Sequence, residues 1–213
     1  MRVVAFVDGF NLYHAVDDLR INHLKWLNIK ALCEQFISSP DLNLEKVLYF
    51  SAYATWLPDA YKRHREYIKA LRAVGVETVM GRFKEKDRKC LKCGAEWKGH
   101  EEKETDVNIA LYLAIGAFQN WYDRALLITG DSDLAPAVRM THKLFPNKEF
   151  RLLSPVNRKH SMDLLQAVGG GKYCTKIKTI HLERALFPEK VYNTTGSIIA
   201  IRPASYAPPI DIP

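Results

Sequence analysis

The sequence predicts an α/β domain with a mostly parallel central sheet. Strand-like and helix-like segments alternate over about 150 residues, which is the pattern of parallel strands joined by crossover helices. Aspartates follow two of the predicted strands, and a charged insertion interrupts the alternation once. Hydrophobic residues make up 47% of the 213, which is enough for a core of ordinary size.

The individual elements are predicted from apolar periodicity. Short apolar runs predict strands at residues 2–7, 46–54, 76–80, 125–129 and 149–153. Helical spacing predicts helices at residues 59–74, at residues 107–118 and from about Leu134 onward, with further helical residues between the first two strands. Gly75 ends the first of these helices, as glycine commonly does, and the helix at 107–118 is apolar on nearly every face.

Two segments depart from this alternation. Residues 84–104 carry 13 charged side chains out of 21, so we expect a small solvated insertion that contains Cys90 and Cys93. Residues 188–213 hold five prolines with little periodicity and are predicted to form an extended or disordered C-terminal tail. We therefore expect one domain over residues 1–187, followed by that tail.

Charge and composition limit the classes of function. The formal net charge of +7 favours polyanionic partners, such as nucleic acid or an anionic membrane surface. Asp8 interrupts the N-terminal apolar run too early for a signal peptide, and no stretch approaches the roughly 20 apolar residues of a membrane span. Four cysteines without an even framework suit a reducing compartment, so we expect a cytoplasmic protein with no membrane association.

Aspartates occur at three places beside the apolar segments that are predicted to form the core, where packing does not require a carboxylate. Asp8 ends the first strand, Asp106 opens the apolar helix, and Asp131 and Asp133 follow the strand at 125–129. The ends of parallel strands and the starts of the following helices share one edge of the sheet, so these aspartates can converge. Convergent carboxylates repel one another unless a cation neutralises them. Hard oxygen ligands favour Mg²⁺ or Mn²⁺, and such ions promote phosphodiester hydrolysis.

Each aspartate taken alone is also a good helix cap, and for Asp133 this structural role competes with the metal role. Asn11 is expected either to orient Asp8 or touch the substrate, or to serve only as a turn residue. Thr129 and Ser132 carry hydroxyls that can hold ligating carboxylates, although either can equally cap a helix or end a strand. The joint placement of three aspartates favours the metal site.

Three segments carry a resemblance to a known family. They are Phe6-Val7-Asp8-Gly9-Phe10-Asn11-Leu12-Tyr13, Glu102-Lys103-Glu104-Thr105-Asp106-Val107 and Thr129-Gly130-Asp131-Ser132-Asp133-Leu134. In this order they resemble the acidic motifs of the NYN domain, a family of the PIN-like nuclease superfamily that includes the LabA-like proteins. The resemblance covers about residues 2–168 and implies a PIN-like three-layer sandwich with divalent-metal-dependent ribonuclease activity. It also implies metal ligation by Asp8, Asp106 and Asp131, with Asp133 as a fourth acid.

Two other enzyme classes fit less well. A haloacid dehalogenase-type phosphatase needs an aspartyl nucleophile followed two residues later by a second aspartate, whereas Gly9 and Phe10 follow Asp8. A P-loop nucleoside triphosphatase needs a glycine-rich loop that ends in Lys-Ser or Lys-Thr, and the sequence has none.

Cys90 and Cys93 have the spacing of a zinc knuckle, which supplies two of the four ligands that a structural zinc ion needs. His100 is the nearest further candidate, and Cys174 or Cys33 can contribute only if the fold brings them close. Two free or redox-active thiols are the equally weighted alternative.

Basic side chains cluster in three places and can follow a phosphate backbone. The residues expected to contact nucleic acid are Lys62, Arg63, Arg65, Arg82 and Lys103. Residues 158–160 form another basic cluster, and Trp56 or Trp97 offers a surface on which a base can stack. Each cluster taken alone is more often a solvated face.

Together these features predict a metal-dependent ribonuclease, and more specifically an endonuclease. Metal-activated water is expected to attack an RNA phosphodiester and to leave 5′-phosphate and 3′-hydroxyl ends. The alternative is a non-catalytic RNA-binding or regulatory module on the same fold. The sequence leaves open the class of RNA, the cleavage of DNA and the oligomeric state, a homodimer included.

Overall fold

The fold is described from a computed structural model over residues 1–37 and 39–209. A seven-stranded sheet with strand order β4-β3-β2-β1-β5-β6-β7 forms its centre. The strands are β1 (Arg2–Asp8), β2 (Asn43–Ala52), β3 (Glu77–Lys89), β4 (Glu96–Lys103), β5 (Arg124–Ile128), β6 (Glu149–Ser154) and β7 (Cys174–Lys176). All neighbouring strands are parallel except β3 and β4, which form an antiparallel hairpin. The predicted, mostly parallel sheet is confirmed.

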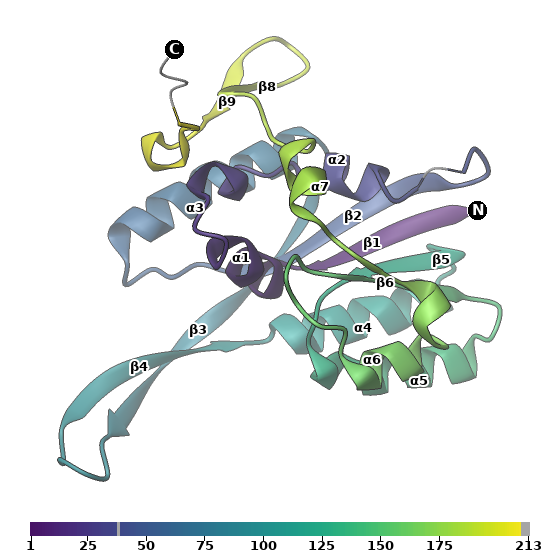
Figure 1. Cartoon of the computed structure of the whole chain (residues 1–213), viewed down its shortest axis with the longest axis horizontal. Helices are drawn as coiled ribbons and strands as arrows, with labels where there is room; N and C mark the ends of the chain where they lie inside the picture. Colours follow the sequence, from purple (N-terminus) through teal and green to yellow (C-terminus); the bar gives the residue numbers. More distant parts are fainter. Residues whose placement is uncertain (38, 210–213) are drawn as a thin grey trace.

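Helices cover both faces of this sheet (Figure 1). One face carries α1 (Gly9–Asp17), α2 (Ile29–Glu34), α3 (Pro58–Ala73) and α7 (Thr179–Glu183). The other face carries α4 (Thr105–Phe118), α5 (Ala135–Leu144) and α6 (Met162–Ala167). Alternate side chains of β1 enter the two cores, with Val3, Ala5 and Val7 in the first and Val4 and Phe6 in the second. The result is the expected three-layer α/β sandwich.

The local signals place the main elements correctly. All five predicted strands and all three predicted helices are found, with boundaries shifted by a few residues except at the end of β3. Pro58 occupies the first turn of α3, where its missing N–H has no cost, and Asp59 adds a favourable charge there. After α3 the chain turns at Gly75, whose φ of +85° is readily adopted only by glycine.

The charged insertion is part of a long β3–β4 hairpin that projects from the body of the molecule (Figure 1). Most of its side chains toward the tip are exposed, as expected, but the strand that we predicted to end at residue 80 continues to Lys89. Cross-strand ion pairs join Lys98 to Glu85 and Lys89 to Glu96. Toward the tip, both faces of the hairpin meet water, so this part of the strands lacks the apolar alternation by which strands are recognised.

The prediction of a disordered tail was wrong for residues 188–209. Strands β8 (Lys190–Tyr192) and β9 (Ile198–Ile201) form a second, two-stranded sheet that packs against α3. Val191 and Ala200 are buried in the core on that side of the central sheet. One buried side chain in each strand attaches the segment to the core. A single apolar residue in each strand gives no periodic pattern that could be recognised in the sequence. Residues 210–213 of the predicted tail lie outside the described residues.

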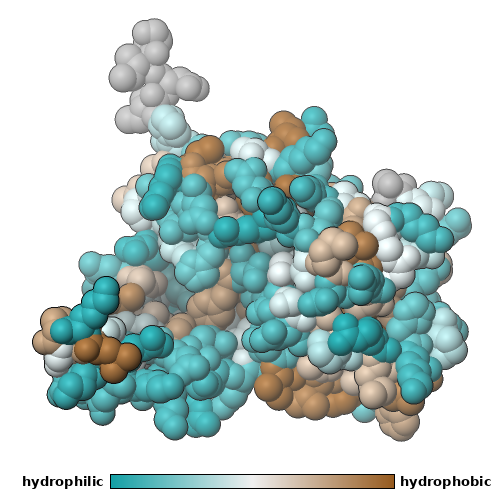
Figure 2. Space-filling model, turned by 60° about the horizontal axis from the view of Figure 1, so that its bottom comes forward, coloured by the Kyte–Doolittle hydropathy of each residue, from teal (hydrophilic) through white to brown (hydrophobic). Residues whose placement is uncertain are grey.

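Helix α4 is apolar on nearly every face, as predicted, but only one of its faces is covered. Ile109, Leu113 and Ala117 are buried, whereas Leu111 and Phe118 are 51% and 77% exposed. A hydrophobic patch is visible at the lower edge of Figure 2, while the rest of that view is mostly hydrophilic. Within the described ranges, no helix has the length and apolarity needed to cross a bilayer.

Candidate functional site

The acidic residues meet where the strand order of the sheet reverses. β1 lies between β2 and β5, and open α/β sheets bind ligands beyond the carboxyl ends of the strands at such a point. Asp8 is the last residue of β1, Asp131 follows β5 and Asp106 stands in the first turn of α4. All three line one cavity of about 780 Å³. The structure therefore places the three aspartates that the sequence analysis singled out along the wall of one cavity.

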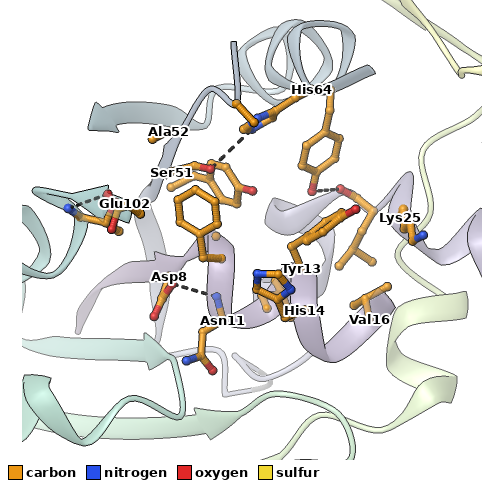
Figure 3. Close-up of a pocket in the computed structure, with 18 of the residues that line it drawn as sticks. Asp8, Asn11, Tyr13, His14, Val16, Lys25, Ser51, Ala52, His64 and Glu102 are labelled. Carbon is orange, nitrogen blue, oxygen red and sulfur yellow. Dashed lines mark hydrogen bonds between the residues drawn. The ribbon is translucent and has the colours of Figure 1, made fainter. Parts of the chain in front are cut away.

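A hydrogen-bond network ties the ends of β1 and β5 together, and Figure 3 shows the bond between Asn11 and Asp8. The Asp8 carboxylate accepts from the Asn11 N–H at 2.9 Å and from the Thr129 hydroxyl at 3.0 Å. Thr129 Oγ1 in turn accepts from the Asp131 N–H at 3.0 Å, and Asn11 Oδ1 accepts from the Gly130 N–H at 2.9 Å. The Asn11 backbone and the Thr129 hydroxyl thus hold Asp8, and Thr129 also holds the backbone of Asp131, while roles for Asn11 and Thr129 in catalysis stay predictions.

The carboxylates lie in an environment that disfavours their charge. Burial is the main cause that raises the pKa of Asp8, to about 6. The hydrogen bonds from Asn11 and Thr129 lower this pKa in part, and the nearby carboxylates of Asp106 and Asp131 raise it by smaller amounts. The pKa of Asp106 is also raised, first by burial and then by repulsion from Asp131 and Glu102. No lysine or arginine of the described chain forms an ion pair with any of the three aspartates. Such a cluster attracts a cation.

The donor set suits a hard divalent ion, although the ligands are not drawn together. Among residues 1–37 and 39–209, no three histidine, cysteine or acidic side chains form a group close enough to hold a metal ion. The available donors are carboxylate oxygens, with uncompensated charge and space for water, which are conditions that Mg²⁺ and Mn²⁺ prefer. By their chemistry, Asp8, Asp106 and Asp131 offer the type of donor that such an ion needs, and their ligation of a metal stays a prediction.

Two of these aspartates also cap helices, as the structural alternative expected. Asp8 caps α1, and Asp131 accepts the Asp133 N–H at 2.9 Å at the start of the short helix η2 (Ser132–Leu134). Asp133 lies outside the main cavity, in a separate shallow depression beside Arg139. The Ser132 hydroxyl makes no hydrogen bond to these carboxylates in the part of the chain described. Roles for Asp133 and Ser132 stay predictions.

The raised pKa of Asp8 predicts a stability effect with a definite sign. The folded-state pKa of about 6 lies above the unfolded value near 4, so folding favours the protonated carboxyl. The contribution of this carboxyl to the free energy of unfolding is therefore fully present below pH 4 and is lost as the pH rises through 6, by about 3 kcal/mol in the absence of metal. Asp8→Asn, which stays neutral, should exceed the wild type by this amount at pH 8 and match it at pH 4.

Urea unfolding in EDTA at the two pH values measures this difference. Asp59→Asn, which removes an exposed carboxylate from the first turn of α3, serves as the control and should show no comparable pH-dependent gain. Equal stability of Asp8→Asn and wild type at pH 8 would contradict the proposed cost of ionising Asp8.

Glu102 joins the site, although the sequence analysis did not select it. Its side chain lines the cavity and accepts hydrogen bonds from the Thr105 hydroxyl and from the Thr105 N–H, so it caps the start of α4. It lies in one of the acidic motifs, but there it is one acid among several in a charged run. The sequence alone does not show that Glu102 contacts Thr105, and this contact is what distinguishes Glu102 from the neighbouring acids.

Glu104 holds a left-handed backbone conformation two residues before Asp106, with φ at +83°. Its side chain forms an exposed ion pair with Arg82 at 2.7 Å. Glu104→Ala and Glu104→Gly both remove that ion pair, but only glycine adopts the conformation freely. We expect Glu104→Gly to be more stable than Glu104→Ala by about 1 kcal/mol in urea unfolding. Equal stabilities would show that the left-handed turn is not retained.

The cavity continues from the acidic edge into a region that the sequence analysis did not predict. Its lining there includes Tyr13, His64 and Tyr206, which come from α1, α3 and the short helix η4 (Ala204–Tyr206). Tyr13 belongs to the first acidic motif, but Tyr206 lies in the segment predicted to be disordered. No sequence pattern links these residues, because they are distant along the chain.

The five residues expected to bind nucleic acid occupy different positions. Arg63 lines the cavity, whereas Lys62 and Arg65 are exposed on α3. Arg82 is paired with Glu104, and Lys103 is paired with Glu101 at 2.8 Å. Of the five, the structure brings only Arg63 into the cavity that contains the aspartates.

The prediction of His100 as a third zinc ligand was wrong. Cys90 and Cys93 lie at the tip of the hairpin, whereas His100 is paired with Glu85 far along its strands and stacks on Trp56 at 3.7 Å between ring centroids. A strand spaces residues by about 3.3 Å, so five residues separate His100 from the tip by far more than a zinc–ligand distance. All four cysteines are free.

Comparisons with known proteins agree with this architecture. The family model of the NYN domain matches residues 2–167. A relative named 6-hydroxy-3-succinoylpyridine 3-monooxygenase HspA, from Pseudomonas putida, is 25% identical over 176 residues, or 66% of this chain. The aligned part spans 55% of that relative, about half its length. A solved structure of a protein of unknown function from Vibrio parahaemolyticus shares the fold, with a TM-score of 0.57, 20% identity, and coverage of 87% of this chain and 96% of that one.

Proposed function

The chain belongs to the NYN domain family of the PIN-like nuclease superfamily, and from this premise we propose that it is a divalent-metal-dependent ribonuclease. The observation that carries the proposal is that Asp8, Asp106 and Asp131 line one end of a cavity and that none of them has a cationic partner among residues 1–37 and 39–209. The proposal includes internal cleavage of RNA and, from cysteine usage, a cytoplasmic location.

In this mechanism Asp8, Asp106 and Asp131 would hold the cation. Bound there, it would supply charge neutralisation for the carboxylates, polarisation of a phosphoryl oxygen and a lowered pKa of bound water. Asn11 and Thr129 keep the carboxylates oriented through their hydrogen bonds. The oxygen of water forms a bond to phosphorus while the bond from phosphorus to the 3′ oxygen breaks. Protonation of that oxygen leaves a 3′-hydroxyl end and a 5′-phosphate end.

Incubation of the purified full chain with labelled linear RNA, circular RNA and DNA tests this function. We expect RNA to be cut in Mg²⁺ or Mn²⁺ and to stay intact in EDTA, and cutting of the circular RNA establishes internal cleavage. RNA that is bound in EDTA but never cut in either metal would instead support the non-catalytic RNA-binding module.

A second candidate is the binding of a substituted pyridine, the kind of compound in the name of the Pseudomonas relative. The aromatic lining of the cavity favours it, because a single ring can stack there. Titration of the full chain with a hydroxypyridine carboxylate distinguishes this candidate from a nuclease whose cavity takes no such ring.

A further inference from the structure

The cavity extends well beyond the acidic edge, and its far half consists of side chains that hydrolysis does not use. Figure 3 shows the lining residues running from Asp8 past Tyr13 and His14 to Lys25, with His64 above them on α3. A volume of about 780 Å³ is that of a site for a small organic molecule. One end of the cavity is acidic. The chemical class of ligand that the cavity can bind therefore depends on the side chains at the other end.

Aromatic rings form much of the far wall. Tyr13, Tyr49, Tyr67 and Tyr206 all line it. Tyr49 and Tyr67 pack edge to face at 6.0 Å between centroids, and the Tyr67 hydroxyl donates to the Leu27 carbonyl at 2.8 Å, which fixes these rings. Rigid aromatic walls favour a planar ring as the ligand, since stacking on them needs little reorganisation.

Positive charge accompanies these rings. The Lys25 ammonium and the Arg63 guanidinium lie 5.8 and 6.0 Å from the centroid of the Tyr206 ring, and Lys159 also lines the cavity. Neither Arg63 nor Lys159 takes part in an ion pair within the described ranges. A ligand that carries an anionic group next to its ring finds an opposite charge here.

Two polar groups are available to the edge of such a ring. Ser51 is only 2% exposed, and its hydroxyl lies 3.5 Å from His64 Nε2. Burial lowers the pKa of His64 to about 4, so its imidazole is neutral near pH 7 and offers one donor and one acceptor. Donors and acceptors on one side of an aromatic slot suit the hydrogen-bonding edge of a nucleobase.

We propose that the far half of the cavity binds one unstacked nucleotide of a single-stranded RNA, with its base against the tyrosines and a neighbouring phosphate at Arg63 and Lys159. The proposal rests on the proposed nuclease function and adds its substrate class, since a paired base cannot enter such a slot. Tyr206 lies beyond residues 2–167, so part of this site comes from outside the region that the family model matches.

Isothermal titration of the full chain with the four nucleoside 5′-monophosphates, in EDTA, tests the site apart from cleavage. We expect at least one to bind, with binding weakened about tenfold or more by Tyr206→Ala. Arg63→Ala should weaken it similarly, and Tyr206→Phe, which keeps the ring, should bind as the wild type does. Tyr192→Ala in the same C-terminal segment and Lys69→Ala on α3 are controls, because neither residue lines the cavity.

Separate outcomes distinguish the site from the nuclease function. If no mononucleotide binds, or if Tyr206→Ala and Arg63→Ala bind as the wild type does, the proposal is overturned. Cleavage of RNA by the same preparation then leaves the nuclease function standing. Binding of a hydroxypyridine carboxylate in place of every nucleotide also overturns the proposal. Nucleotide binding without any RNA cleavage supports the site and contradicts the nuclease function.

Discussion

Asp131→Asn should lower the rate of RNA cleavage by about a hundredfold or more, because one ligand of the cation loses its charge. The fold should survive the change. The carboxylate of Asp131 accepts the Asp133 N–H at the start of η2, and the side-chain carbonyl of asparagine accepts the same bond. Initial rates on labelled RNA, with thermal unfolding of each variant, measure both expectations.

Asp59→Asn makes the same chemical change at an exposed position outside the cavity, so its cleavage rate should equal that of the wild type. A folded Asp131→Asn variant that cuts RNA at the wild-type rate would show that the acidic edge is not the active site. The family membership and the fold would be unaffected by that result.

Gly9→Ala should reduce both stability and cleavage, since the residue after Asp8 has no room for a side chain. A Cβ atom there would lie 2.5 Å from Tyr49 Cζ and 2.6 Å from the Phe50 carbonyl oxygen. Tyr49 and Phe50 are buried in β2, and Phe50 is paired with Asp8 across the sheet, so the backbone has to move. We expect a loss of about 3 kcal/mol in urea unfolding.

The rate of RNA cleavage should fall by about tenfold or more in the same variant, because Asp8 would be displaced from its position at the site. A shift of about 1 Å in a reacting group can cost about a hundredfold in rate. Gly171→Ala is the matched control. Nothing lies within 4 Å of its Cβ position, so its stability should stay within about 0.5 kcal/mol of the wild type. If Gly9→Ala is as stable as the wild type, the Tyr49 ring and β2 can move to make room for the added methyl group, and the predicted clash does not occur.

The sequence was sufficient to predict those features that depend on short-range patterns. β1 is recognisable because apolar residues fill it up to Asp8, and α3 because Gly75 ends its periodic run. The convergence of Asp8 and Asp131 could also be predicted, since it follows from a general property of parallel sheets. Polar strands were less accessible, and for that reason β4 was predicted only as charged insertion.

Features that depend on contacts between distant segments were not accessible in this way. Val191 and Ala200 turn an apparent tail into a packed hairpin, yet each is a single apolar residue in a polar, proline-containing stretch. The far wall of the cavity joins Tyr13 and Tyr206, which nearly 200 residues separate. We proposed His100 as a zinc ligand with Cys90 because the two are close in the sequence. In an extended strand, however, residues a few positions apart lie far from one another in space.

The central position of β1 has a consequence for when activity can arise during synthesis. β1 pairs with β2 on one side and with β5 on the other, so Asp8 is made first but gains Asp131 only about 120 residues later. Tyr206 emerges later still. Because chains fold from the N-terminus while they are translated, a ribosome-bound fragment that ends before β5 has Asp8 and Asp106 but lacks Asp131 and the strand that places it. On the proposed function, the acidic edge is therefore complete only after β5 and Asp131 have been made.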